Sequence, residues 1–183
     1  MGSKSDLRSH FKNMLSALSC EREVRSQLIC SRLDEFIINL NLPKFSYLGV
    51  FDPLDDEVDW KSLKLSPEVK LVYPRFIESG QMDFAEVNEK NLSHSFGVEL
   101  LEPHSSAPPK TPDVILVPAL AFDKKGYRLG RGAGFYDRYL ANYKGLSIGI
   151  CFKECVIKEL PRKSHDVPVD YVVSEEGVFK REV

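Results

Sequence analysis

The segment RLGRGAGFYDR (residues 128–138) holds the densest set of residues in this chain that could do chemistry. It combines three glycines with the cations Arg128 and Arg131 and with one acid, Asp137. Glycines let backbone N–H groups approach an anion closely, and the forked guanidinium matches phosphate oxygens. The segment therefore favours a phosphate-binding loop, and a plain glycine-rich turn with solvated arginines is the alternative that spacing leaves open.

The two best-known nucleotide motifs do not fit this segment. There is no G-x-x-x-x-G-K-[ST], and Phe135 stands where G-x-G-x-x-G needs its third glycine. The local pattern thus indicates a phosphate without naming the ligand.

Asp137 has two interpretations. Next to a phosphate loop, its carboxylate is a suitable ligand for Mg²⁺, which takes one or two protein carboxylates together with phosphate oxygens. An acid in the first turn of a helix is also favoured by the helix dipole alone. A second metal carboxylate is available in HDVPVD, as Asp166 or Asp170.

The elements around this segment predict how it is positioned. DVILVP (113–118) is a continuous apolar run, typical of a strand covered on both faces, and ligands in open α/β sheets usually lie beyond the carboxyl ends of such strands. Apolar spacing predicts helices over 4–18, from a cap at Ser19 to just before Pro43, and over 134–143. Further strands are predicted over 45–51, 69–76, 82–87, 146–152 and 170–174. Of these, 69–76 and 82–87 are expected to form a hairpin, and 102–112 is predicted to be a proline-rich surface loop.

This alternation predicts the α/β class, with an open, mixed and mostly parallel sheet that carries helices on both faces. At 183 residues we expect a single domain over 1–183. The composition, 43% hydrophobic and 28% charged, is that of a soluble globular protein. With no membrane-length apolar run and no secretory start, we expect a cytoplasmic protein without a membrane partner.

Charge and composition also narrow the ligand class. The net charge of −2 gives no global attraction for nucleic acid, so we expect a small-molecule ligand and no nucleic-acid partner. The four cysteines contain no C-x-x-C pair and are interpreted as reduced thiols. The four histidines show no metal-ligand spacing and are interpreted as surface or capping groups.

A longer stretch, VPALAFDKKGYRLGRGAGFYDRYL (117–140), resembles the signature of the 5-formyltetrahydrofolate cyclo-ligase family, also called methenyltetrahydrofolate synthetases. Lys4 and Arg8 match the family's K-x-x-x-R, and GVFDPLDDEVD, VYPRF, MDF and HDVPVD follow in the family's order. The resemblance therefore covers nearly the whole chain, and it implies a fold like those of sugar-phosphate isomerases and CoA transferases.

The resemblance implies ATP- and Mg²⁺-dependent conversion of 5-formyltetrahydrofolate to 5,10-methenyltetrahydrofolate, with release of ADP and phosphate, by a protein we expect to be monomeric. The formyl oxygen is expected to attack the γ-phosphate, after which N10 of the folate attacks the activated carbon. Phosphoryl transfer asks a protein mainly for positioning and charge neutralisation, so no nucleophilic side chain is required.

Matching positions carry the family's site residues onto this chain. The catalytic cations fall on Arg128 and Arg131, the magnesium carboxylates on Asp137 and Asp166. The nucleotide-binding positions are Lys4, Arg8, Arg128, Leu129, Gly130, Arg131, Gly132, Ala133, Gly134, Phe135 and Tyr136. The folate-binding positions are Arg8, Asp52, Glu57, Arg131, Gly132, Gly134 and Phe135. For the folate-contacting acid, Asp55 and Asp56 remain alternatives to Glu57.

Two positions depart from the family's pattern. Ala133 stands where relatives often carry Lys or Gly, so Arg131 is expected to carry more of the phosphate charge, and Phe135 stands where some relatives have Tyr. A non-catalytic folate- or nucleotide-binding module on the same fold is the alternative function. A sugar-phosphate isomerase relative is a third reading, but it needs a general base near the loop, and the sequence offers none.

Overall fold

The computed structural model describes residues 3–39, 47–77, 80–87, 92–95 and 98–182, with 92–95 and 98–99 described by backbone alone. The helices are α1 (Lys4–Ala17), α2 (Arg22–Asn39) and α3 (Phe135–Leu140), and 3-10 turns lie at Ser19–Glu21, Trp60–Ser62 and Lys153–Cys155. The strands are β1 (Tyr47–Gly49), β2 (Lys70–Phe76), β3 (Met82–Ala85), β4 (Leu92–Ser95), β5 (Val98–Leu101), β6 (Val114–Pro118), β7 (Ala121–Asp123), β8 (Arg128–Leu129), β9 (Leu146–Ile150), β10 (Val156–Ile157), β11 (Tyr171–Ser174) and β12 (Gly177–Lys180).

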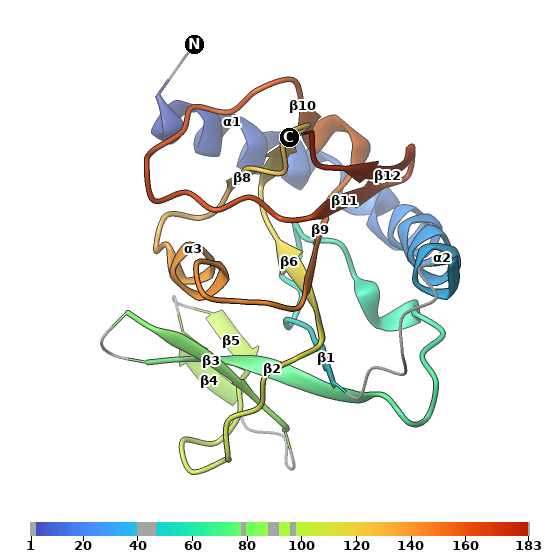
Figure 1. Ribbon diagram of the computed structural model, residues 1–183. Coiled ribbons are helices and arrows are strands. Elements are labelled where there is room, and N and C mark those ends of the chain that lie inside the picture. The colour runs from blue at the N-terminus through green and yellow to red at the C-terminus, as the bar shows by residue number, and fades with distance from the viewer. Residues whose placement is uncertain (1–2, 40–46, 78–79, 88–91, 96–97, 183) are drawn as a thin grey trace.

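A seven-stranded sheet in the order β12-β11-β9-β6-β1-β2-β3 forms the centre of the molecule (Figure 1). The pairings from β11 through β9, β6 and β1 to β2 are parallel, and both edge pairings are antiparallel. This topology confirms the predicted mixed, mostly parallel α/β sheet. A three-stranded sheet β10-β7-β8 and the hairpin β4-β5 complete the strands.

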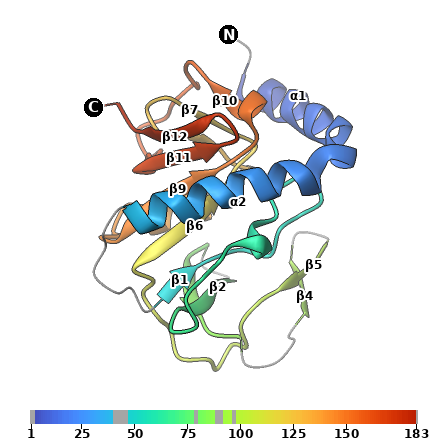
Figure 2. The same ribbon diagram turned by 90° about the vertical axis from the view of Figure 1, so that its right-hand side faces the viewer.

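Helices cover the two faces of this sheet. In Figure 2, α2 lies in front of β6 and β9, and Figure 1 shows α2 on one side of these strands and α3 on the other. Phe36 of α2 packs on Tyr171 of β11 with ring centroids 4.8 Å apart, and Tyr139 of α3 packs on Phe84 of β3 at 5.1 Å. Because both faces are covered, β6 is buried almost throughout, as its apolar sequence predicted.

Close packing also brings the small sheet onto the large one. A Cβ on Gly149 of β9 would lie 2.5 Å from the ring of Phe122 in β7, so only glycine admits this ring. The contact fixes β7 and its partner β8 directly over the carboxyl end of the central strands. Arg128, the first residue of the glycine-rich segment, is thereby placed by core packing.

Helix α1 begins at a well-formed cap. Ser3 Oγ accepts from the Asp6 N–H at 3.2 Å, and Asp6 Oδ2 accepts from the Ser3 N–H at 2.9 Å, which is a capping box. Phe11 and Leu15 bury the inner face of the helix. This start fixes Lys4 in the first turn and Arg8 one turn later.

Several sequence-based expectations need correction in detail. Ser19 does not cap the second helix, because the Glu21 N–H donates to the Leu18 carbonyl and Ser19 lies inside a 3-10 turn. Helix α3 ends at Leu140 rather than at residue 143. Pro43 and residues 45–46 lie outside the described part of the chain. The other predicted strands and the 69–76/82–87 hairpin are confirmed, and 102–112 is irregular as expected.

Short strands were missed by sequence reasoning. β7, β8 and β10 have only two or three residues, too few for a period-2 pattern to appear. Among the described helices, none combines the length and the apolar character that crossing a membrane requires.

Candidate active site

A cleft of about 510 Å³ opens where α1, the 51–57 segment, the glycine-rich loop and the 163–166 segment meet. Its lining contains all the residues that the sequence analysis proposed: Lys4, Arg8, Asp52, Glu57, Arg128, Leu129, Gly130, Arg131, Gly132, Ala133, Gly134, Phe135, Tyr136, Asp137 and Asp166. These residues come from distant parts of the chain, so the fold brings the proposed positions together in one place.

The glycine-rich loop leaves strand β8 and enters helix α3 through two turns of unusual backbone. Gly132 has φ 120° and Gly134 has φ 70°, values that favour glycine. Arg8 donates from Nε to the Gly130 carbonyl at 2.9 Å and so holds the loop against α1. Helix α3 has only six residues, so the helix dipole adds little, and the loop's own N–H groups are the donors that an anion could use here.

The third arginine of the segment does not line the cleft. Arg138 donates from Nη2 to the Ala133 carbonyl at 2.9 Å and from Nε to the Gly80 carbonyl at 2.6 Å. Its guanidinium also lies 5.2 Å from the ring centroid of Phe135. Arg138 therefore braces the loop from outside.

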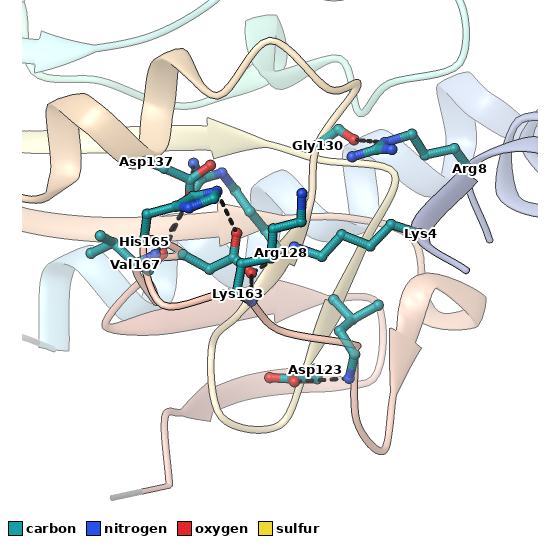
Figure 3. A network of polar contacts seen from close by, with 11 residues as sticks. Lys4, Arg8, Asp123, Arg128, Gly130, Asp137, Lys163, His165 and Val167 are labelled. Carbon is teal, nitrogen blue, oxygen red and sulfur yellow. Dashed lines mark hydrogen bonds and ion pairs between the residues drawn. The ribbon is translucent and has the colours of Figure 1, made fainter. Parts of the chain in front are cut away.

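Buried Arg128 forms an ion pair with the partly exposed Asp137 in the lining of the cleft (Figure 3). Nη2 of Arg128 lies 2.8 Å from Oδ1 of Asp137, and Nη1 donates to the Val167 carbonyl at 3.1 Å. The Val167 N–H donates in turn to Asp137 Oδ1 at 3.2 Å. Burial lowers the pKa of Arg128, whose side chain is only 3% exposed, while Asp137 opposes that shift. Arg128 thus holds Asp137 and the 163–167 segment in one arrangement.

Lys4 and Asp166 form a second pair on the same side of the cleft. Their Nζ and Oδ2 atoms are 2.5 Å apart, and the Lys163 N–H donates to the same oxygen at 2.6 Å. Burial opposes ionisation of Asp166, but these two donors prevail and hold its pKa below the ordinary value. Figure 3 shows Lys4 reaching from α1 toward the 163–167 segment.

Asp137 and Asp166 fit the requirements of magnesium better than those of zinc. Their described hydrogen bonds use Oδ1 of Asp137 and Oδ2 of Asp166, so each carboxylate has a second hard oxygen donor. Within the described ranges, no three His, Cys, Asp or Glu side chains are placed to hold a metal ion. A pair of carboxylates suits an ion that also takes phosphate oxygens and water. Asp170 lies elsewhere and accepts from the Ser147 N–H and hydroxyl at 3.0 and 2.7 Å.

Residues 51–57 form a further wall of the cleft, called the acidic wall here because Asp52 and Glu57 line it. Arg131 pairs with Asp56 and, at 3.2 Å, with Oε1 of Glu57. The other Glu57 oxygen accepts from the Leu54 N–H at 3.1 Å. Burial raises the pKa of Glu57, and Arg131 opposes this shift. Asp52, in the same segment, accepts from the Leu101 N–H at 3.0 Å.

Aromatic side chains close the cleft on the α3 side. Phe135 packs on Phe76 with ring centroids 4.8 Å apart, so it serves packing as well as lining the cleft. The Tyr136 hydroxyl is buried and has no hydrogen-bond partner among the described residues. Burial raises the pKa of Tyr136, which keeps the phenol neutral.

Three basic residues line the cleft that sequence reasoning did not assign to it: Lys12, Lys163 and His165. Lys12 follows Arg8 by one helical turn, so the spacing of Lys4 and Arg8 could have indicated it. His165, expected to be a surface group, is 70% exposed and lies at the rim. Lys163 could not be found from spacing, because the irregular 158–170 segment reaches the cleft only through tertiary contacts such as the bond from the Leu160 N–H to buried Asp123 at 3.0 Å.

The chain is similar in sequence to known proteins. The model of the 5-formyltetrahydrofolate cyclo-ligase family matches residues 1–175. Mouse 5-formyltetrahydrofolate cyclo-ligase is 29% identical over 199 residues, which cover 95% of this chain and 94% of the mouse protein.

Solved structures extend the match to the fold. The NMR structure of Aquifex aeolicus 5,10-methenyltetrahydrofolate synthetase superimposes with a TM-score of 0.78 at 32% identity, covering 98% of this chain and 93% of that one. A 5,10-methenyltetrahydrofolate synthetase from Mycoplasma pneumoniae gives 0.74 at 22% identity, covering 95% and 99%. Family model, relatives and fold agree along almost the whole length, and the chain therefore belongs to the 5-formyltetrahydrofolate cyclo-ligase family of enzymes.

Proposed function

We propose that the protein uses ATP and Mg²⁺ to close 5-formyltetrahydrofolate into 5,10-methenyltetrahydrofolate, with release of ADP and phosphate. The observation that carries this proposal is the set of residues that line one cleft. A glycine-rich loop, the cations of α1, the carboxylates Asp137 and Asp166, and the buried acid Glu57 all face the same space.

The two sides of the cleft suit the two substrates. Lys4, Arg8 and the loop amides offer donors to the phosphates of ATP. Asp137 and Asp166 would hold magnesium, which when bound neutralises charge on the phosphates. Glu57 and Asp52 on the opposite wall offer acceptors to the N–H groups of the pteridine, next to the apolar surface of Phe135 and Phe51.

The chemistry that this arrangement supports is phosphoryl transfer followed by ring closure. The formyl oxygen attacks the γ-phosphorus, an O–P bond forms, and the bond from that phosphorus to ADP breaks. N10 then attacks the activated carbon and loses its proton. The C–O bond breaks, and inorganic phosphate leaves with the former formyl oxygen.

The two arginines have different parts in this proposal. Arg128 is buried and bonded through both terminal nitrogens, so it fixes the carboxylate of Asp137. Arg131 is 34% exposed and lies at the junction of loop and acidic wall, where it can meet the transferring phosphate. Backbone amides and cations of this kind stabilise transferring phosphate without a protein nucleophile.

Turnover tests the proposal directly. Protein mixed with MgATP and 5-formyltetrahydrofolate is expected to give the absorbance of methenyltetrahydrofolate, with one ADP released per product, and a chelator of Mg²⁺ is expected to abolish both. No product above background would refute the proposal. Binding of both ligands without ADP release would instead identify the non-catalytic module.

A further inference from the structure

One face of helix α2 is bonded to the backbone of the acidic wall. Arg22, Ser26 and Cys30 follow one another at four-residue intervals, so they lie on one side of the helix. Arg22 Nε donates to the Glu57 carbonyl at 2.7 Å, and Ser26 Oγ accepts from the Asp59 N–H at 3.0 Å. Cys30 Sγ completes the row at 3.5 Å from the Asp59 carbonyl. Three successive turns of α2 thus hold residues 57–59.

The same short segment faces the cleft on its other side. Glu57 lines the cleft, and its carboxylate pairs with Arg131 of the glycine-rich loop. Its main-chain carbonyl is the atom that Arg22 holds. Glu57 therefore connects two elements: its carbonyl binds Arg22 of α2, and its carboxylate binds Arg131 of the glycine-rich loop.

A hydrogen bond between Trp60 and Phe51 joins the two ends of the 51–60 segment. Trp60 is buried, and its indole N–H donates to the Phe51 carbonyl at 2.6 Å. This bond ties the end of the 51–60 segment to its beginning. Within this segment the Glu57 carboxylate and N–H are bonded to Leu54, whereas its carbonyl is bonded to Arg22 of α2. The Arg22 bond is thus the contact that ties the main chain of Glu57 to the helix behind it.

We propose that Arg22 is a positioning residue that sets the place of Glu57, and through it the affinity for the folate. The proposal rests on the proposed function, because that function gives Glu57 its folate. Arg22 does not itself line the cleft. It acts by holding a main-chain atom, so its effect is expected on the folate and much less on the nucleotide, whose predicted donors come from α1 and the loop.

Helix α2 also supplies a matched control. Arg32, also on α2, donates from Nε to the Glu175 carbonyl at 2.6 Å, a bond of the same kind as that of Arg22 and of nearly the same length. Glu175 does not line the cleft. Arg22→Met and Arg32→Met therefore each remove one arginine-to-carbonyl bond from the same helix, and only the first touches the acidic wall.

Steady-state kinetics separates the two cases. Arg22→Met is expected to raise the KM for 5-formyltetrahydrofolate about five- to tenfold while the KM for MgATP stays within about twofold. Arg22→Lys, which keeps a donor, is expected to recover part of the loss. Arg32→Met is expected to leave both KM values within about twofold of wild type. Equal changes in the two Met variants, or no change in Arg22→Met, would overturn the proposal.

Trp60 gives a readout that does not require turnover. It is the single tryptophan of the chain and lies next to the segment that Arg22 holds. Arg22→Met is expected to increase the quenching of its emission by acrylamide and to weaken 5-formyltetrahydrofolate binding followed by the same emission. Wild-type-like quenching and binding in that variant would contradict the proposal.

The experiment distinguishes its own failure from that of the proposed function. If wild-type protein shows no turnover, the proposed function fails, and the Trp60 measurements still decide whether Arg22 positions the folate wall. If Arg22→Met does not fold, Ser26→Ala and Arg22→Lys take its place. Both are then expected to raise the folate KM in the same direction, and wild-type folate KM in both would overturn the proposal.

Discussion

At the scale of single residues, the decisive features of the cleft are pairings between opposite charges. Arg128 is bonded to Asp137, Lys4 to Asp166, and Arg131 to Asp56 and Glu57. These ion pairs hold the cations and the carboxylates of the cleft in fixed positions. In the proposed reaction, phosphate and magnesium would take over partners that already lie in position, which limits the reorganisation needed.

Asp137→Asn is expected to lower Mg²⁺-dependent turnover by about 100-fold, because an amide is a poor ligand for magnesium. Its oxygen still accepts from Arg128 and from the Val167 N–H, so we expect the free energy of unfolding to fall by only about 1 kcal/mol. Turnover assays over a magnesium titration, together with urea unfolding, measure both effects.

Asp170→Asn is the matched control for that variant. Asp170 binds Ser147 outside the cleft, so its turnover is expected to stay within about twofold of wild type. A wild-type rate in Asp137→Asn, or an equal loss in Asp170→Asn, would remove Asp137 from the proposed site.

The local pattern indicated Arg128, Arg131 and Asp137, and the family resemblance added Lys4, Asp166 and Glu57, but neither identified their partners. The resemblance placed Asp166 in the site, whereas HDVPVD alone left Asp166 and Asp170 equivalent. The structure puts Asp166 in the cleft and Asp170 on Ser147. Arg138, the third arginine of the segment, bonds to the carbonyls of Ala133 and Gly80. Such differences depend on side-chain direction in the folded chain, which spacing does not contain.

At the scale of elements, the glycine-rich loop depends on backbone conformation more than on the helix that follows it. Gly134 has φ 70°, and a Cβ there would lie 3.0 Å from Nη1 of Arg138. Gly130 is different, because nothing lies within 4 Å of an added Cβ. The glycines of the loop are therefore not equivalent.

Gly134→Ala is expected to lower the free energy of unfolding by about 1–2 kcal/mol, because an L-residue pays for the left-handed conformation. Gly130→Ala is expected to leave it unchanged within about 0.5 kcal/mol. Urea unfolding of the two variants beside wild type checks this difference. Equal stability of the two variants would show that the loop does not require its left-handed turn.

Periodicity predicted the long elements well and the short ones poorly. The helix periods of α1 and α2 and the apolar runs of β6 and β9 are confirmed. The strands β7 and β8 were missed, although they carry Arg128 into the cleft. They exist because Phe122 packs over Gly149 and because β7 pairs with β8 and β10, which are tertiary causes.

At the scale of the whole molecule, helix α2 contacts both the β11–β12 edge of the sheet and the acidic wall of the cleft. Arg25 is buried and bonds to Glu175 and Glu154, both at 2.5 Å, while its guanidinium lies 5.0 Å from the ring centroid of Phe152. The same helix holds the acidic wall through Arg22. Helix α2 thus joins the far edge of the sheet, at β11 and β12, to the cleft.

The Arg25 cluster predicts a pH dependence of stability. Burial opposes ionisation of Glu154, but its bond to Arg25 prevails and lowers the pKa of Glu154 in the folded protein. A depressed carboxyl pKa gives stability that is present above the unfolded pKa, near 4.5, and is lost as the pH falls through the folded value. The Tm of wild type is therefore expected to exceed that of Glu154→Gln at pH 7, and the gap is expected to shrink in acid.

Glu176→Gln is the control for this pH dependence. Glu176 is an exposed acid in the turn between β11 and β12, next to Glu175 of the cluster. The Tm of the Glu176→Gln variant is expected to equal that of wild type across the whole pH range. A gap between wild type and Glu154→Gln that does not depend on pH would contradict the assigned charge pairing.

The central claim is that this cleft transfers the γ-phosphoryl group of ATP to the formyl oxygen of the folate. Turnover of 5-formyltetrahydrofolate carrying ¹⁸O in the formyl group tests it most directly, with mass analysis of the inorganic phosphate released. One labelled oxygen per phosphate is the predicted result, because the formyl oxygen leaves the carbon as part of that phosphate. Unlabelled phosphate formed together with methenyltetrahydrofolate would contradict the account.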